Sequence, residues 1–317
     1  MRLRCDRRHH RFEVPLRAGA GRQAHAGEDR VTQLLQALLN GVMTGALIAV
    51  PAIGFSAIFA VLRYPNFAIA AYATIGAFAA WWANVVLGLP IMAALAVAFA
   101  VTGVVGVAAE ETALKRLRGN GALIVAIASI ALNLVLENIV RFLFGNEMRG
   151  YDLPIARDLR FGDLRVGPQQ LQSLLLSVVI MAAMFLFLRY TRFGKAMRAV
   201  ADNPDLARLK GIDPAKIAIV TLFLGAGLTG VGGVLIGLDT SIDPLTGYRV
   251  LLSVFAAAVL GGLGSIPGAV AGALMLGIAE ELALLAVPAT YRTAVGFVAI
   301  LLMLTFRPRG LLGERAA

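Results

Sequence analysis

Cysteine and histidine are scarce in this sequence, and both are confined to its first part. The chain has one cysteine, Cys5, and three histidines, His9, His10 and His25, all before residue 31. One cysteine allows no internal disulfide bond, and no Cys/His cluster has the spacing of metal ligands. Residues 31–317 therefore lack the commonest nucleophile, general base and metal ligand. We predict no catalytic residue, no metal site and no enzymatic activity.

Charged residues are also few, at 15% of the chain against about 25% in soluble domains. Apolar residues make up 59%, and that much apolar surface would aggregate in water. The composition excludes a disordered chain, a disulfide scaffold and an ordinary cytosolic enzyme, and it predicts a membrane protein. The net charge of +10 does not indicate nucleic-acid binding, because Lys and Arg lie between apolar blocks without interleaved aromatic residues.

Residues 1–30 differ from the rest of the chain. They hold eight of the 29 Lys and Arg and no periodic apolar pattern. The segment lacks the apolar core of a secretory signal, and four acidic residues without any serine are unlike a transit peptide. Two interpretations stay open. In the first, translation begins at Val31 from a GTG codon, because Gly27-Glu28-Asp29 can be encoded by purine-rich bases that resemble a ribosome-binding site. In the second, residues 1–30 are a disordered basic extension.

Long apolar runs follow from Leu34 onward. They fall at 34–62, 66–86, 90–109, 122–144, 170–189, 214–237, 250–263, 266–287 and 290–306. Roughly 20 helical residues cross a bilayer, and the ten-residue alternating segments of a β-barrel are absent, so the expected fold is all-α and polytopic. The 250–263 run has only 14 residues. Whether it crosses fully stays open, which gives eight or nine transmembrane segments.

The loops between these runs differ in positive charge. Fourteen Lys and Arg fall at 63, 115–118, 189–216 and 307–315, whereas six arginines fall in the alternate loops, at 149–165, 249 and 292. Because positive charge is retained on the cytoplasmic side, the richer set is expected to be cytoplasmic. Nine crossings then place residue 31 outside and the C-terminus in the cytoplasm.

The long basic segment 190–213 carries signals for a short, well-defined helix. Asn203 is suited to the N-cap, Pro204 to the first helical position and Gly211 to a left-handed stop. Asp213-Pro214 then repeats the cap and proline before the next apolar run. Small residues beside the basic ones, such as Ala199 and Ala207, favour a helix lying in a partner's groove. A basic surface helix on anionic lipid is the alternative.

Short motifs recur in a fixed order between Leu34 and Gly313. They are LLNG (38–41), NFA (66–68), the segment 194–213, AVLGGLGSIPGA (258–269), LGIAE (276–280) and RPRGLLG (307–313). Together they resemble the permease subunits of bacterial branched-chain amino-acid ABC importers of the LivH type. One departure is Ile69-Ala70, where that family usually has His-Gly after NFA. This change leaves urea or short amides open as alternative cargo.

The resemblance implies a multi-pass subunit of the bacterial inner membrane that transports branched-chain or other hydrophobic amino acids. The implied partners are a second homologous permease, cytoplasmic ABC ATPase subunits and a periplasmic substrate-binding protein. By the same resemblance, segment 190–213 couples the permease to the ATPase. The residues expected to do so are Gly194, Arg198, Ala199, Asn203, Ala207, Arg208, Gly211, Ile212 and Asp213.

The chain has no G-x-x-x-x-G-K-[ST] motif with which to hold ATP phosphates. It is therefore expected to bind no cofactor itself, and ATP and Mg²⁺ are expected in partner subunits. An ion-coupled secondary transporter, which needs no ATPase subunit, is the rival class.

Polar residues inside the apolar runs are costly and need an explanation. The candidate substrate-pathway residues are Asn66, Asn133, Glu137, Arg141 and Glu280. Glu137 and Arg141 form a favourable i, i+4 pair, which either is structural or contacts the substrate's zwitterionic group. Glu280 has Arg249 and Arg292 as candidate partners. The two asparagines serve equally well as hydrogen bonds between helices, and the glycine-rich stretches 225–233 and 261–277 predict close helix packing.

Overall fold

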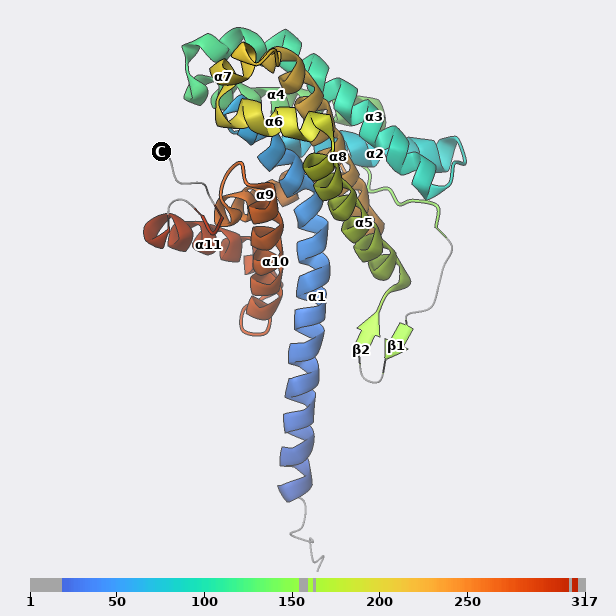
Figure 1. Ribbon diagram of the computed structural model, residues 1–317. Coiled ribbons are helices and arrows are strands. Elements are labelled where there is room, and N and C mark those ends of the chain that lie inside the picture. Colours follow the sequence, from blue (N-terminus) through green and yellow to red (C-terminus); the bar gives the residue numbers. More distant parts are fainter. Residues whose placement is uncertain (1–18, 154–158, 162–163, 308–309, 313–317) are drawn as a thin grey trace, which may run out of the picture.

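The computed structural model describes residues 19–153, 159–161, 164–307 and 310–312 and shows a helical bundle (Figure 1). Within those residues, eight helices are long and apolar enough to cross a membrane. They are α1 (Gly19–Leu62), α2 (Ile69–Trp81, continued by η1, Trp82–Val86), α3 (Ile91–Ala109, continued by η2, Glu110–Leu114, and η3, Lys115–Asn120), α4 (Ala122–Phe144), α5 (Pro168–Tyr190), α8 (Pro214–Asp239), α10 (Ile266–Ala283) and α11 (Arg292–Phe306, preceded by η4, Ala289–Tyr291). The predicted all-α polytopic fold is confirmed.

The shorter elements complete the described chain. They are β1 (Leu159–Phe161) and β2 (Leu164–Val166), which form an antiparallel hairpin, α6 (Arg192–Asp202), α7 (Pro204–Leu209) and α9 (Thr246–Gly261). The 16 residues of α9 span about 24 Å, less than the roughly 30 Å hydrocarbon core. Most of the short apolar run at 250–263 therefore belongs to one short helix, which begins at Thr246 and ends at Gly261.

The α1 helix is continuous from Gly19 into its apolar part, and residues 1–18 lie outside the described residues. Its candidate membrane span is Val31–Leu62. The start of translation at Val31 stays a prediction. Figure 1 shows α1 running through the bundle and past the other helices toward the N-terminus.

Close contacts between helix ends and connecting segments define the two ends of the bundle. At one end, Arg63 donates to the backbone oxygen of Ala201, and Leu311 N donates to Leu260 O at 2.9 Å. At the other end, Gln36 contacts Arg165, and Arg149 forms a β-bridge with Ile242. Twelve of the fourteen Lys and Arg of the richer loops lie at the first end, which we call the basic end. The remaining two, Arg309 and Arg315, lie outside the described residues.

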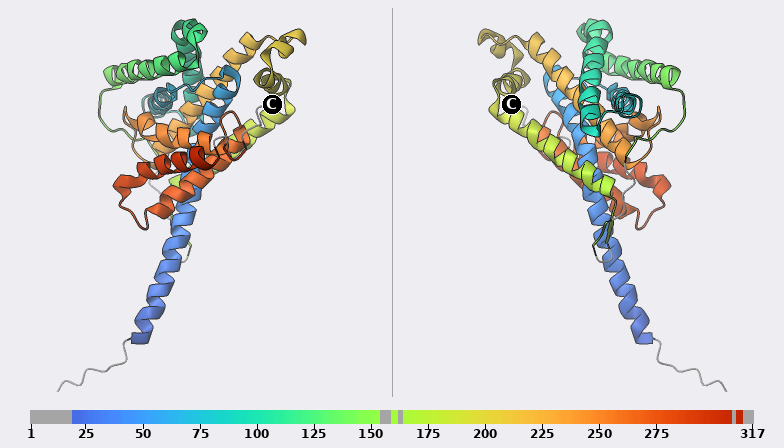
Figure 2. Two further views of the ribbon diagram at one scale, coloured as in Figure 1. Left: turned by 90° about the vertical axis from the view of Figure 1, so that its left-hand side faces the viewer. Right: turned by 90° about the vertical axis from the view of Figure 1, so that its right-hand side faces the viewer.

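The centre of the bundle is formed by α1 and α8. The apolar window of each is more than two-thirds buried, whereas that of α11 is 12% buried. Both further views place α1 among the other helices (Figure 2). The peripheral helices leave broad apolar faces for lipid or other subunits.

Glycine permits the closest helix contacts. A Cβ atom added to Gly76 of α2 would lie 2.3 Å from the Cα of Gly230 in α8. One added to Gly277 of α10 would lie 2.4 Å from the backbone nitrogen of Gly45 in α1. Real side chains do not tolerate such distances, so the predicted close packing of the two glycine-rich stretches is confirmed.

Candidate coupling surface and substrate cavity

The coupling segment at the basic end has the helix signals expected from the sequence. The Asn203 side-chain oxygen accepts hydrogen bonds from the amides of Asp205 and Leu206, each at 3.0 Å, and caps α7. Gly211 has a φ of +81°, and the amide of Ile212 donates to Ala207 O at 3.0 Å. This is a Schellman-type helix stop. Asp213 caps α8 through the amide of Ala215, so the predicted caps and stop are confirmed.

A second helix, α6, was missed by the sequence reasoning. Thr191 accepts the amide of Gly194 at 3.0 Å and caps it, and the apolar Phe193, Met197 and Val200 follow at helical spacing. This cap and spacing would have predicted the helix. A Cβ atom added to Gly194 would lie 2.1 Å from Leu188 O, so the crossing of α5 and α6 requires glycine.

The expected coupling residues divide into internal and exposed groups. Arg198 donates to Leu188 O at 2.6 Å and ties α6 to the end of α5. Ala199 and Ile212 are half-buried, and Ala207 is buried, so its small side chain packs within this chain. Arg208 is exposed beside Leu206 and Leu209, which are 54% and 84% exposed. We call Leu206, Arg208 and Leu209 the α7 face.

The turn between α1 and α2 connects α6 with the interior. Arg63 has a φ of +60°, which is rare for a residue with a side chain, and it donates to the carbonyl of Ala201 near the end of α6. Four residues later, the amide of Phe67 donates to Ser129 of α4 at 2.9 Å. Phe67 also lines the cavity described below. A single short turn therefore touches both the coupling segment and the cavity.

A polar cluster holds the same turn against η2 and η3, which continue α3. The Tyr64 hydroxyl donates a hydrogen bond to the carboxylate of Glu110. Arg118 donates to the same carboxylate, with its Nε 2.9 Å from Oε1 of Glu110. Burial raises the pKa of Tyr64, and the negative charge of Glu110 raises it further. Tyr64 therefore stays protonated and serves as a donor. The sequence reasoning did not identify this cluster, because its members are far apart along the chain.

A large cavity lies toward the end opposite the basic end and has a volume of about 790 Å³. Its walls come from α1, the α1–α2 turn, the end of α8, α9, α10 and α11. The polar lining residues are Thr44, Asp239, Thr240, Ser241, Thr246, Tyr248, Arg249, Ser253, Glu280 and Arg292. Apolar side chains, including Phe67, Phe255 and Phe297, line other parts. Such a mixture is typical of sites for small molecules with a polar group.

Glu280 is the predicted pathway residue that lines this cavity. Its Oε2 lies 3.1 Å from Nε of Arg292, and its Oε1 accepts a hydrogen bond from Ser253 at 2.9 Å. Of the two partners proposed for it, Arg292 is the one in contact, whereas Arg249 pairs with Asp243. Ser253 and Asp243 were missed by sequence reasoning, because neither belongs to a recognisable motif.

The two asparagines cap a helix start inside the protein. The Oδ1 of Asn133, on α4, accepts the amide of Ala71 at 2.7 Å, and the Oδ1 of Asn66 accepts the amide of Ala68 at 3.0 Å. Both asparagines are buried. These bonds satisfy the first amides of α2, which water cannot reach. Asn133 therefore connects α4 to α2 by a hydrogen bond, whereas Asn66 bonds within the α1–α2 turn. Neither asparagine lines the cavity.

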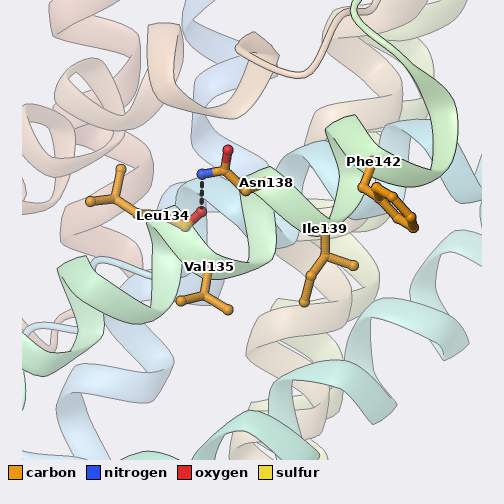
Figure 3. Close-up of a pocket in the computed structure, with 5 residues that line it drawn as sticks. All are labelled: Leu134, Val135, Asn138, Ile139 and Phe142. Carbon is orange, nitrogen blue, oxygen red and sulfur yellow. Dashed lines mark hydrogen bonds between the residues drawn. The ribbon is translucent and has the colours of Figure 1, made fainter.

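Glu137 and Arg141 form the i, i+4 ion pair expected on α4. Glu137 is buried, and neither residue lines the large cavity. The opposite face of α4 is exposed: Figure 3 shows Leu134, Val135, Asn138, Ile139 and Phe142 along it. The side-chain nitrogen Nδ2 of Asn138 donates a hydrogen bond to Leu134 O at 2.7 Å, which satisfies one of its donors within the helix.

The two residues of the departure from the family pattern, Ile69 and Ala70, lie outside the cavity lining. Ile69 is buried in the hydrophobic core with Ile48 and Phe55, and neither Ile69 nor Ala70 lines the cavity. A Cβ atom added to Gly247 would lie 1.8 Å from Ala70 O, so this point is a close contact between α2 and α9. The Ile69-Ala70 pair is therefore a packing feature.

A bundle of membrane-spanning helices with a cavity of mixed polar and apolar lining, and with an exposed helical surface at its basic end, is the arrangement expected of a membrane transport permease. Residues 37–306 match the family described as branched-chain amino acid transport system, permease component, and the chain belongs to that family. The resemblance of the sequence motifs to LivH-type permeases is thereby confirmed.

Named relatives agree with this assignment. The chain is 32% identical over 294 residues to the high-affinity branched-chain amino acid transport system permease protein BraD of Pseudomonas aeruginosa, covering 88% of this chain and 96% of BraD. It is 32% identical over 299 residues to LivH of Escherichia coli K12, with the same coverage of both chains. The probable branched-chain amino acid transport permease protein LivH of Methanocaldococcus jannaschii is 28% identical, covering 77% of this chain and 79% of the relative.

Proposed function

We propose that this chain is the pathway-forming subunit of an ATP-driven importer for branched-chain or other hydrophobic amino acids in a bacterial inner membrane. Its partners are a second homologous permease, cytoplasmic ABC ATPase subunits that bind ATP and Mg²⁺, and a periplasmic substrate-binding protein. The names of BraD and LivH, which refer to high-affinity branched-chain amino acid transport, support this cargo. The apolar and charged walls of the cavity suit it as well.

The orientation follows from the charges of the loops. The basic end carries the larger number of Lys and Arg, and such loops are retained in the cytoplasm. The C-terminus and segment 190–213 are then cytoplasmic, and the cavity lies toward the periplasmic side. Substrate released by the binding protein enters at that side.

The observation that carries the proposal is the exposed α7 face. Leu206 and Leu209 are large apolar side chains exposed on a helix that is capped at one end and stopped at the other. Exposed apolar residues on a short rigid helix, flanked by basic ones, suit a groove in a partner protein. Because the chain has no phosphate-binding motif, the partner that supplies energy is a separate ATPase.

Site-specific photo-crosslinking in intact cells tests this proposal. A photoreactive residue in place of Arg208 is expected to capture a protein with a G-x-x-x-x-G-K-[ST] motif. The matched control is the same residue in place of Met148, which is 68% exposed near the opposite end of the bundle and should capture none. Leucine uptake by the purified chain without any ATPase would instead establish an ion-coupled transporter, and uptake of urea but not leucine would reassign the cargo.

A further inference from the structure

Two carboxylates share one guanidinium at the wall of the large cavity. Glu280 lies 3.1 Å from Arg292, and Oε1 of Glu281 lies 2.8 Å from Nη2 of the same arginine. The side chains of Glu280 and Glu281 are only 3% and 12% exposed. Thr44 adds a neutral contact to Glu281. This group therefore carries one uncompensated negative charge in a place where unpaired charge is costly.

The rest of the described wall does not supply the missing positive charge. Arg249 is the other arginine that lines the cavity, and its guanidinium pairs with Asp243. Asp239 also lines the cavity and adds a further carboxylate. The lining itself holds two carboxylates, Asp239 and Glu280, and two guanidiniums, Arg249 and Arg292. Each arginine also pairs with a carboxylate outside the lining, Asp243 or Glu281, so the lining and its direct partners hold four carboxylates and two guanidiniums, although the whole chain has a net charge of +10.

The apolar part of the cavity limits the shape of an occupant. Phe67 and Phe255 pack with ring centroids 5.6 Å apart, and Ile48, Leu251 and Phe297 line neighbouring parts of the wall. The volume of about 790 Å³ is within the range of small-molecule sites. A small molecule with a cationic group and a short apolar side chain matches both the charge and the surface.

We infer that Glu280, positioned by Ser253 and Arg292, binds the α-ammonium group of the transported amino acid. The inference rests on the proposed function and adds the recognising residue. Each carboxylate oxygen of Glu280 already accepts one hydrogen bond, from Ser253 or from Arg292. A carboxylate has about four acceptor positions, so capacity for an ammonium group remains. The amino-acid side chain then lies against Phe67 and Phe255.

Protection of a cysteine from alkylation measures binding at this cavity directly. Ser241→Cys, on a Cys5→Ser background, places a thiol among the lining residues, where Ser241 is exposed. Membranes containing the full transporter complex are treated with an impermeant maleimide and three probes. The probes are leucine, 3-methylbutylamine, which keeps the ammonium group but lacks the carboxylate, and 4-methylpentanoate, which lacks the ammonium group. Leucine and 3-methylbutylamine are expected to protect, and 4-methylpentanoate is not.

Glu280→Gln tests the residue while keeping the size of its side chain and an acceptor for Ser253. It is expected to raise the half-protecting concentration of 3-methylbutylamine by about tenfold or more, as loss of a charge-assisted hydrogen bond requires. Glu280→Asp should restore part of the affinity because it keeps the charge. The control is Glu111→Gln, which changes an exposed carboxylate paired with Lys115 at the basic end and should leave protection unchanged.

The outcomes separate the inference from the proposed function. The inference alone is wrong if leucine is transported and protects the thiol, but the probes protect the thiol equally well in the Glu280→Gln variant and in the unaltered chain. Equal protection by 4-methylpentanoate and 3-methylbutylamine also overturns it. If the unaltered complex neither transports leucine nor is protected by it, the proposed function fails, and the inference fails with it.

Discussion

The α7 cap gives a prediction whose size follows from the structure. Asn203→Ala removes the oxygen that accepts the amides of Asp205 and Leu206. Loss of an asparagine N-cap costs about 1 kcal/mol of helix stability, which corresponds to about a fivefold change in the folding equilibrium of α7. The six-residue helix is exposed on the α7 face and has little tertiary packing apart from Ala207, so most of this loss should act locally.

Hydrogen exchange of the purified transporter complex measures the effect. The amide of Lys210 bonds to Leu206 O and depends on a formed helix, so its exchange should accelerate about fivefold in Asn203→Ala. Asn203→Asp keeps an acceptor at the cap and is the matched control. Leucine uptake should fall in the alanine variant and be retained in the aspartate variant, since docking requires a formed α7. Unchanged exchange at Lys210 would refute the assigned role of the cap.

Three other changes test the packing and the connection between the two ends. Asn133→Ala leaves a buried α2 amide without an acceptor at a cost of about 1–3 kcal/mol and should lower the thermal midpoint of the complex, whereas Asn138→Ala, at an exposed position of the same helix, should not. Gly76→Leu places side-chain atoms against the α8 backbone and should prevent accumulation in the membrane; Gly119→Leu, with no neighbour within 4 Å of an added Cβ, should be tolerated. Arg63→Ala breaks the bond between the α1–α2 turn and α6, and it should reduce leucine uptake per ATP hydrolysed without reducing binding of the ATPase. An equal ratio of leucine uptake to ATP hydrolysis in Arg63→Ala and in the unaltered chain would show that this hydrogen bond does not couple ATP hydrolysis to transport.

Local chemistry made much of the molecule predictable. Apolar run length predicted the membrane helices, except that the short run at 250–263 stayed open, because a bilayer leaves the backbone few alternatives. The α7 boundaries followed from Asn203 and Gly211, since caps and left-handed stops depend on residues that are neighbours in sequence. The same information was available for α6 in Thr191, although the sequence reasoning did not use it.

The tertiary structure decided which polar residues share a site. Glu280, Glu281 and Arg292 lie on two helices and meet Ser253 of a third, and nothing in their spacing selects Arg292 over Arg249. Two roles for Asn133 were consistent with the sequence, and only the position of α2 against α4 shows that it caps a helix. Helix length and caps are set by interactions a few residues apart, whereas a cavity depends on how whole helices pack and rotate. That packing is fixed by glycine contacts between helices distant in sequence.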